Sequence, residues 1–300
     1  MSEHAIQTEQ LSKAYGSHPA LTGLDLEVRT GEVYGFLGPN GAGKSTTIRL
    51  LLDLLRPTSG RVRVLGMDPL TKGIEIRSRT GYLAGELALE SRQNVDELLR
   101  FLARLRGGAG RDRIPALADR LDLDLSRQIK GLSKGNKQKV GIVQAFMHDP
   151  ELLILDEPTS GLDPLMRQVF LELVSEARLR GATVFMSSHV LSEVQTAADR
   201  VGIIRGGRLV TVDDVEAIRR RAVRRVEIQF ATEVPESEFS RLPNVSDLEV
   251  RGSELHCQVN GVPDALVKAA ARFEVLDIVS EEPDLEEIFI GEYEEAQHAH

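Results

Sequence analysis

A run of nine residues near the N-terminus has the composition and spacing of a phosphate-binding loop. It matches the pattern G-x-x-x-x-G-K-[ST] at every fixed position and consists of Gly38, Pro39, Asn40, Gly41, Ala42, Gly43, Lys44, Ser45 and Thr46. Glycines let the backbone turn its N–H groups inward around a phosphate, and the N-terminus of a following helix adds partial positive charge. Lys44 is expected to reach the β- and γ-phosphates, and the Ser45 hydroxyl is expected to bind Mg²⁺. The loop therefore predicts binding of a nucleoside triphosphate with Mg²⁺.

The segments on either side favour this interpretation over a simple glycine turn. The apolar residues 33–37 predict a buried strand directly before the loop. Ile48, Leu51, Leu52 and Leu55 recur at helical spacing, so a helix is expected over residues 47–55. A strand, the loop and a helix in this order are the context that the motif requires.

Two adjacent carboxylates form a second candidate site. Asp156 and Glu157 follow the apolar residues 152–155, which predict a fully buried strand. Ligands of open parallel sheets bind at the carboxyl ends of the strands. Asp156 is expected to hold Mg²⁺, directly or through a water, and Glu157 to polarise an attacking water. Two adjacent acids can instead cap a helix, but the upstream phosphate loop favours the chemical role.

Strands and helices alternate through the first 215 or so residues, which predicts an α/β domain with a largely parallel sheet covered on both faces. Asp163 is expected to cap a long helix that begins with Pro164. The expected strands are residues 6–15, 24–28, 33–37, 61–65, 80–83, 152–155, 183–186, 201–204 and 208–212. The expected helices are residues 47–55, 95–105, 114–121, 135–147 and 164–180.

Charge changes abruptly near residue 225. The net charge of −9 divides into −14 for residues 226–300 and +5 for residues 1–225. Such a break suggests a domain boundary, and we expect one domain at 1–221 and a second domain at 222–300. The second domain is expected to be a small βαββαβ, ferredoxin-like α+β unit with strands 225–230, 245–250, 254–259 and 274–279, helices 236–242 and 265–272, and a closing helix at 284–293. Its acidity argues against nucleic-acid binding.

Composition indicates a globular chain, with 41% hydrophobic and 28% charged residues. No stretch approaches the roughly 18 consecutive apolar residues of a transmembrane helix, and residues 1–10 lack the apolar core of a secretory signal. Cys257 is the only cysteine and lies in an alternating stretch, so a packed strand thiol is expected and a cytoplasmic protein is the simplest interpretation.

Six motifs in order resemble those of the ATP-binding subunit of ABC transporters, over residues 5–215. Two of the six are the phosphate loop and the Asp156-Glu157 pair already described. The others are an aromatic position at Tyr15, a signature-like segment at Leu132-Ser133-Lys134-Gly135-Asn136, a D-loop-like segment at Ser160-Gly161-Leu162-Asp163-Pro164 and a switch histidine at Ser187-Ser188-His189.

The resemblance implies a P-loop ABC ATPase domain with a mixed sheet core and a helical subdomain at about 86–150. It implies that ATP is sandwiched head to tail between two copies. Tyr15 would stack on adenine, and His189 would contact the γ-phosphate and help to organise Glu157. The signature residues would touch ATP held by the second copy, and Asp163 would connect the two halves; these signature residues are Ser133, Lys134, Gly135 and Asn136.

Two positions depart from the family pattern. Gly85 stands where the family usually has a glutamine that contacts Mg²⁺ or water, and Glu86 or a water could substitute. In the signature, Lys134 replaces a glycine and Asn136 a glutamine. The Ser-Lys-Gly form and the extra C-terminal domain are similar to one branch, the ATPases of bacterial drug, bacitracin, sodium and polysaccharide exporters.

The resemblance implies an ATPase subunit that energises an exporter, with drug or antibiotic efflux expected. Its partners would be a separate integral-membrane permease and a second copy of itself or a homologous ATPase, and it would sit at the cytoplasmic face of the cell membrane. The alternative is an ABC-type ATP switch with a regulatory or mechanical role. Relatives that act on DNA or ribosomes carry a long coiled-coil insertion or two ATPase halves, and this chain has neither.

Overall fold

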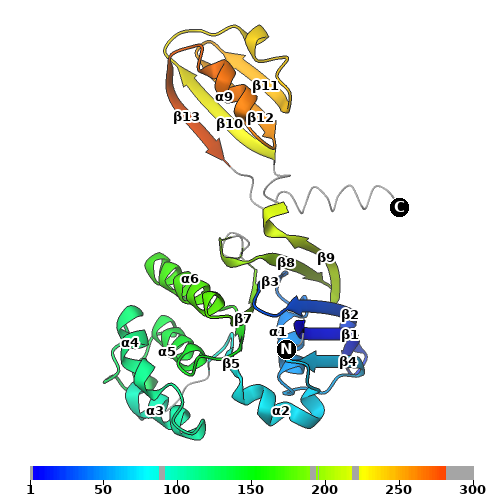
Figure 1. Ribbon diagram of the computed structural model, residues 1–300, viewed down its shortest axis with the longest axis vertical. Coiled ribbons are helices and arrows are strands. Elements are labelled where there is room, and N and C mark those ends of the chain that lie inside the picture. The colour runs from blue at the N-terminus through cyan, green and yellow to red at the C-terminus, as the bar shows by residue number, and fades with distance from the viewer. Residues whose placement is uncertain (1–2, 88–91, 190–193, 195, 218–222, 282–300) are drawn as a thin grey trace. The chain divides into compact units, whose positions relative to one another are not determined.

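The computed structural model describes residues 3–87, 92–189, 194, 196–217 and 223–281 (Figure 1). The chain divides into two compact units, residues 1–213 and residues 214–300. Within the described residues no helix is long and apolar enough to cross a membrane.

A six-stranded sheet forms the centre of the first unit. Its strand order is β5-β6-β7-β3-β8-β9. The first five strands in this order pair in parallel. The strands are β5 (Thr80–Leu83), β6 (Leu152–Asp156), β7 (Thr183–Ser188), β3 (Val33–Leu37), β8 (Arg200–Arg205) and β9 (Arg208–Asp214). Every residue of β3, β6 and β7 is buried, which explains why these strands are mostly apolar. The prediction of a largely parallel sheet is confirmed.

Three further strands do not join the central sheet. They form a separate antiparallel sheet. Its order is β2-β1-β4, with β1 (His4–Tyr15), β2 (His18–Arg29) and β4 (Ser59–Val64). The helix α1 (Lys44–Leu51) contacts β2, β4 and β6. One apolar core therefore joins the two sheets through α1, and it includes Ile6, Leu26, Phe36, Ile48 and Phe185.

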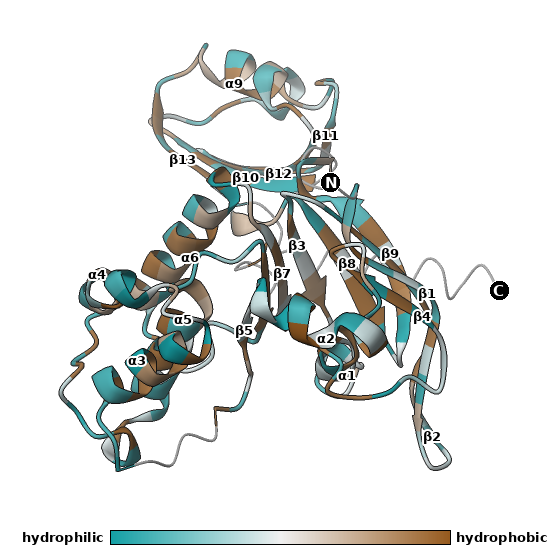
Figure 2. Ribbon diagram, turned by 60° about the horizontal axis from the view of Figure 1, so that its bottom comes forward, coloured by the Kyte–Doolittle hydropathy of each residue, from teal (hydrophilic) through white to brown (hydrophobic). Residues whose placement is uncertain are grey.

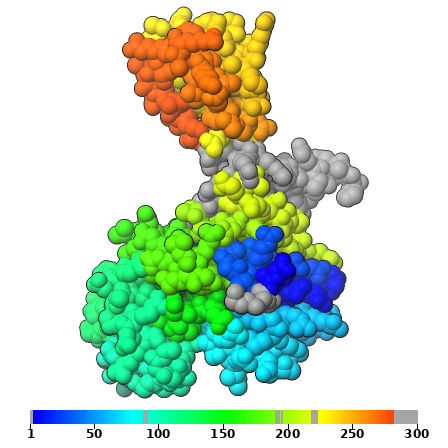
Figure 3. Space-filling view, viewed as in Figure 1, coloured from blue at the N-terminus to red at the C-terminus, as the bar shows by residue number. Residues whose placement is uncertain are grey.

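Helices cover the central sheet on its two sides. Figure 2 shows α5 and α6 on one side and α1 on the other. The helices α3 (Val95–Leu105) and α4 (Ile114–Arg120) pack on α5 (Lys134–Phe146), and these three form a helical group. Helix α5 contacts β5, and α6 (Pro164–Leu179) contacts β7. In Figure 3 this green helical group and the cyan segment near residue 75 lie beside each other on one face of the unit.

Helix boundaries correct the sequence analysis at two places. The helix expected over 47–55 ends at Leu51, because Asp53 adopts a left-handed backbone with φ of 57°. The helix α2 (Pro69–Ser78) was not predicted, because its apolar residues show little periodicity. Its signal is local: Asp68 accepts a hydrogen bond from the Leu70 N–H, and Pro69 occupies the first turn.

The second unit is a four-stranded antiparallel sheet with one helix. The strand order is β11-β12-β10-β13, with β10 (Val223–Phe230), β11 (Val245–Arg251), β12 (Glu254–Asn260), α9 (Asp264–Ala270) and β13 (Val275–Glu281). Cys257 is 5% exposed on β12, and burial raises the pKa of its thiol to about 11. The prediction of a packed strand thiol is confirmed.

The prediction of a helix over residues 236–242 is wrong. Only a 3₁₀ turn forms, at Glu236–Glu238. Pro235 and Pro243 bracket the segment, and a residue before proline avoids helical backbone angles, so too few residues remain for an α-helix. Phe239 is fully buried against the rings of Phe230 and Phe273. The expected helix over 284–293 lies outside the described residues.

Candidate functional site

The phosphate-binding loop connects β3 to α1, as its motif requires. Gly38 and Gly43 are needed for close approach, because an added Cβ would lie 2.3 Å from the Ile204 carbonyl oxygen and 2.7 Å from the Leu21 side chain, respectively. Gly43 also has φ of 113° at the N-terminus of α1. A pocket of about 200 Å³ is lined by Ala20, Glu157 and residues 39–46. Backbone N–H groups and a helix N-terminus thus face a cavity suited to a phosphate.

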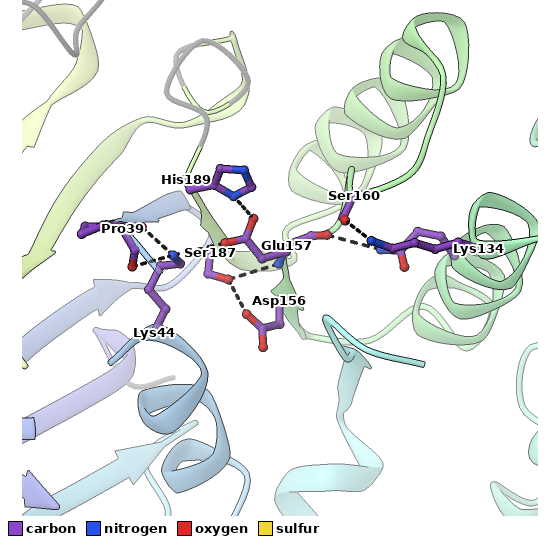
Figure 4. A network of polar contacts seen from close by, with 10 residues as sticks. Pro39, Lys44, Lys134, Asp156, Glu157, Ser160, Ser187 and His189 are labelled. Atoms are coloured by element: carbon purple, nitrogen blue, oxygen red, sulfur yellow. Dashed lines mark hydrogen bonds and ion pairs between the residues drawn. The ribbon is translucent and has the colours of Figure 1, made fainter. Parts of the chain in front are cut away.

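Lys44 is buried in this loop, with 5% exposure. Its Nζ donates to the carbonyl oxygens of Gly38 and Pro39 and lies 3.2 Å from Oε1 of Glu157 (Figure 4). The ammonium is therefore held between the loop and the carboxylate that ends β6.

Asp156 is the last residue of β6 and is 6% exposed. Its Oδ1 accepts a hydrogen bond of 2.6 Å from the hydroxyl of Ser187 on β7. The same Ser187 oxygen accepts from the Glu157 N–H at 3.2 Å. Ser187 thus fixes both acids, and sequence analysis missed this role because the pairing of β6 with β7 creates it.

Glu157 has a strained backbone, with φ of 47°. Positive φ at a residue with a side chain costs free energy and is found at functional sites. Its Oε2 lies 2.6 Å from Nδ1 of His189. Its Oε1 is buried and, among the described residues, hydrogen-bonds to none, although Lys44 lies within ion-pair distance. This oxygen therefore faces the Lys44 ammonium.

A pocket of about 490 Å³ brings together most of the predicted chemical residues. Its lining comprises Asn40, Ser45, Arg49, Tyr82, Ala84, Gly85, Glu86, Lys134, Asp156, Glu157, Ser160 and His189. The Ser45 hydroxyl and the Asp156 carboxylate are hard oxygen donors of the kind that Mg²⁺ prefers, so the residues fit this ion. Burial and the charge of Asp156 raise the pKa of Tyr82, which therefore stays a hydroxyl donor.

Gly85 lies beside Asp156. A Cβ added at Gly85 would be 3.4 Å from the Asp156 carboxylate, which is an ordinary contact. Glu86 lines the same pocket and is exposed. The position where the family usually has its glutamine thus adjoins the Asp156 carboxylate, and Glu86 lines the same pocket.

The signature-like segment begins α5. Ser133 caps the helix and accepts from the Asn136 N–H at 3.3 Å. Lys134 donates from Nζ to the Ser160 hydroxyl at 3.1 Å. Gly135 packs closely on Gly161, since an added Cβ would lie 2.6 Å from the Gly161 carbonyl oxygen. The segment therefore contacts the chain's own turn after Glu157.

Tyr15 and Asp163 are among the predicted site residues that do not line the pocket around Asp156. Tyr15 ends β1 with 47% exposure, and the Lys13 ammonium lies 5.4 Å from its ring centroid. Asp163 caps α6 by accepting from the Met166 N–H at 3.0 Å, which confirms the predicted cap. Sequence analysis missed Arg49, which is one helical turn beyond Ser45 and faces the same pocket.

Comparison with known proteins agrees with this geometry. The ABC transporter family model matches residues 21–160. The chain is 38% identical over 229 residues to the bacitracin transport ATP-binding protein BcrA of Bacillus licheniformis, covering 75% of each chain. It is 32% identical over 302 residues to the linearmycin resistance ATP-binding protein LnrL of Bacillus subtilis, covering 95% of this chain and 97% of the relative.

Among solved structures, an ATP-binding subunit of an ABC transporter is 32% identical with a TM-score of 0.68 and covers 72% of this chain and 92% of that one. The predicted fold class and the resemblance are confirmed. Members of this family bind ATP with Mg²⁺, hydrolyse it, dimerise and act with membrane permeases. These relatives agree with the phosphate loop, the paired acids and the histidine. The chain therefore belongs to the family of ATP-binding proteins of ABC transporters.

Proposed function

We propose that this chain energises an exporter by closing on ATP as a dimer, and that Glu157 directs water at the γ-phosphate. The observation that carries the proposal is the arrangement around Glu157. One carboxylate oxygen is bound by His189, and the other is buried without a hydrogen bond from the described residues. A general base needs a positioned carboxylate with a free lone pair directed at water.

The phosphate loop supplies the binding step. Its N–H groups would hold the phosphates, and Lys44 would move from Glu157 to the β- and γ-phosphates as ATP enters. That movement leaves Oε1 of Glu157 as an acceptor for the attacking water. Bound Mg²⁺, held by Ser45 and Asp156, would neutralise charge on the phosphate oxygens.

Other residues hold ATP or the catalytic groups. His189 would keep the Glu157 carboxylate in place and contact the γ-phosphate. Tyr15 offers its exposed ring to adenine. The signature residues Ser133, Gly135 and Asn136 would touch ATP in the second copy. Asp163 would help to connect the two halves.

Glu157→Gln tests the catalytic role. An amide keeps the size of the side chain but cannot take a proton, so phosphate release should fall by about 100-fold or more while ATP binding persists. The variant should also form a dimer that ATP stabilises. Glu172→Gln, at an exposed position on α6, is the matched control. Unchanged phosphate release in the Glu157 variant removes it from the role of base.

The transported cargo and the partner are part of the proposal. The bacitracin and linearmycin names of the relatives support an antibiotic-like cargo. The chain would act at the cytoplasmic face of the cell membrane through a separate permease. Pull-down of the tagged chain from detergent-solubilised native membranes should recover a stoichiometric multi-span protein, and cargo should stimulate its ATPase. An ATPase rate that no tested cargo stimulates would favour a regulatory switch instead.

A further inference from the structure

Helix α5 contacts the turn after Glu157 at two levels. At its first residue, the ammonium of Lys134 donates to the Ser160 hydroxyl at 3.1 Å (Figure 4). One turn later, Gln138 is 3% exposed and donates to the Pro158 carbonyl oxygen at 2.8 Å. The start of α5 and residues 157–160 are therefore tied together by side-chain hydrogen bonds.

The backbones of the two segments also lie in close contact. The Gly161 carbonyl oxygen would lie 2.6 Å from a Cβ at Gly135, so the two segments touch directly. The Ser160 N–H donates to the Glu157 carbonyl oxygen at 3.1 Å, which closes the turn. A displacement of Ser160 is thus transmitted to Glu157 through one hydrogen-bonded turn.

The backbone of Glu157 depends on this support. Its φ of 47° is unfavourable for a residue with a side chain and persists only when the surroundings hold it. Ser187 holds the N-terminal side of Glu157, through its carbonyl oxygen and its hydroxyl, both at 3.2 Å from the Glu157 nitrogen. On the C-terminal side, the turn that contacts Lys134 and Gln138 supplies the support.

We propose that Lys134 is a positioning residue for the Glu157 carboxylate, through Ser160. The inference rests on the proposed role of Glu157 as general base. Lys134 stands where the family usually has glycine, which has no side chain that could make this contact. Whatever engages the segment 133–136 then also moves Glu157 of the same chain, while Gln138 keeps the turn anchored.

A double-mutant cycle tests the tie. Lys134→Met and Ser160→Ala each remove the hydrogen bond, and each should lower kcat at least about threefold with an unchanged KM for ATP. The double variant should lose no more than either single one, because both remove the same contact. Lys134→Arg retains a donor and should recover most of the rate. Lys137→Met, three residues along α5, is the control and should keep the wild-type kcat.

Two kinetic results would overturn the proposal. Independent, multiplicative losses in the double variant would mean that Lys134 and Ser160 do not act together. A raised KM and weaker ATP-dependent dimerisation in Lys134→Met, with Ser160→Ala silent, would place the ammonium on ATP in the second copy instead.

Hydrogen exchange of the ATP-free protein separates this inference from the proposed function. Lys134→Met should speed exchange at the Ser160 and Leu162 amides, whose hydrogen bonds close the turn, and Lys134→Arg should restore slow exchange. Unchanged exchange would count against the tie even if Glu157 is the base. Faster exchange together with an active Glu157→Gln variant would keep the tie and discard the proposed role of Glu157.

Discussion

His189 lies 2.6 Å from Glu157, with its Nδ1 facing Oε2 of the carboxylate. The histidine follows β7 and the acid follows β6, and these strands are neighbours in the central sheet. The contact is more exposed on the histidine side, at 54% against 21% for the glutamate. His189 can therefore leave or re-form this contact without rearrangement of the core.

His189→Ala should reduce turnover while sparing ATP binding. The variant loses one hydrogen bond to Glu157 but leaves the phosphate loop intact, so kcat is expected to fall by roughly 10- to 100-fold with little change in KM. Steady-state phosphate release gives both constants. His256→Ala, at a half-buried position on β12 in the second unit, is the control. A rate equal to that of the control would show that the histidine is dispensable.

Gly85→Gln should be tolerated and should strengthen Mg²⁺ binding. The backbone of Gly85 is not left-handed and its Cβ would make only ordinary contact with Asp156, so no large loss of stability is expected. The new amide oxygen would lie beside the metal-binding carboxylate, and the Mg²⁺ concentration for half-maximal ATPase should fall by about threefold or more. Mg²⁺ titration of the ATPase measures it, with Gly85→Ala, which adds a Cβ but no amide oxygen, as the control. An unchanged Mg²⁺ requirement would show that residue 85 has no part in metal binding.

His148 should make the fold sensitive to mild acid. Burial, with the charge of Arg106 acting in the same direction, lowers the pKa of His148 to about 4, and its Nδ1 is buried without a partner among the described residues. The unfolded chain has the ordinary pKa of about 6.5 and binds the proton first. Stability is thus complete above pH 6.5 and falls as the pH drops from about 6.5 to about 4.

Between pH 7.5 and pH 5 this group should cost about 2 kcal/mol of unfolding free energy. Urea unfolding at the two pH values measures the loss, and His148→Gln should show a smaller one because it has no ring to protonate. Gln also keeps a donor for the Thr80 carbonyl oxygen, which His148 contacts at 3.3 Å. Equal acid sensitivity in the two proteins would assign the effect to other groups.

Local patterns were enough to predict the chemical residues. The phosphate loop, the acids at 156 and 157 and the cap at Asp163 are short segments whose backbone geometry depends on adjacent residues. The alternation of apolar strands and helices likewise predicted the parallel sheet, because strands covered by helices on both faces are mostly apolar. Family resemblance then supplied the order of the motifs and the role of His189.

Contacts between distant segments needed the tertiary structure. The role of Ser187 arises from strand pairing, the contact of Lys134 with Ser160 joins residues 26 positions apart, and Gly85 meets Asp156 across the pairing of β5 with β6. The separate antiparallel sheet is also decided by packing, since strand partners are chosen among residues far apart in the chain. Sequence alone predicted which groups could do the chemistry, and the fold decided which contacts hold them in place.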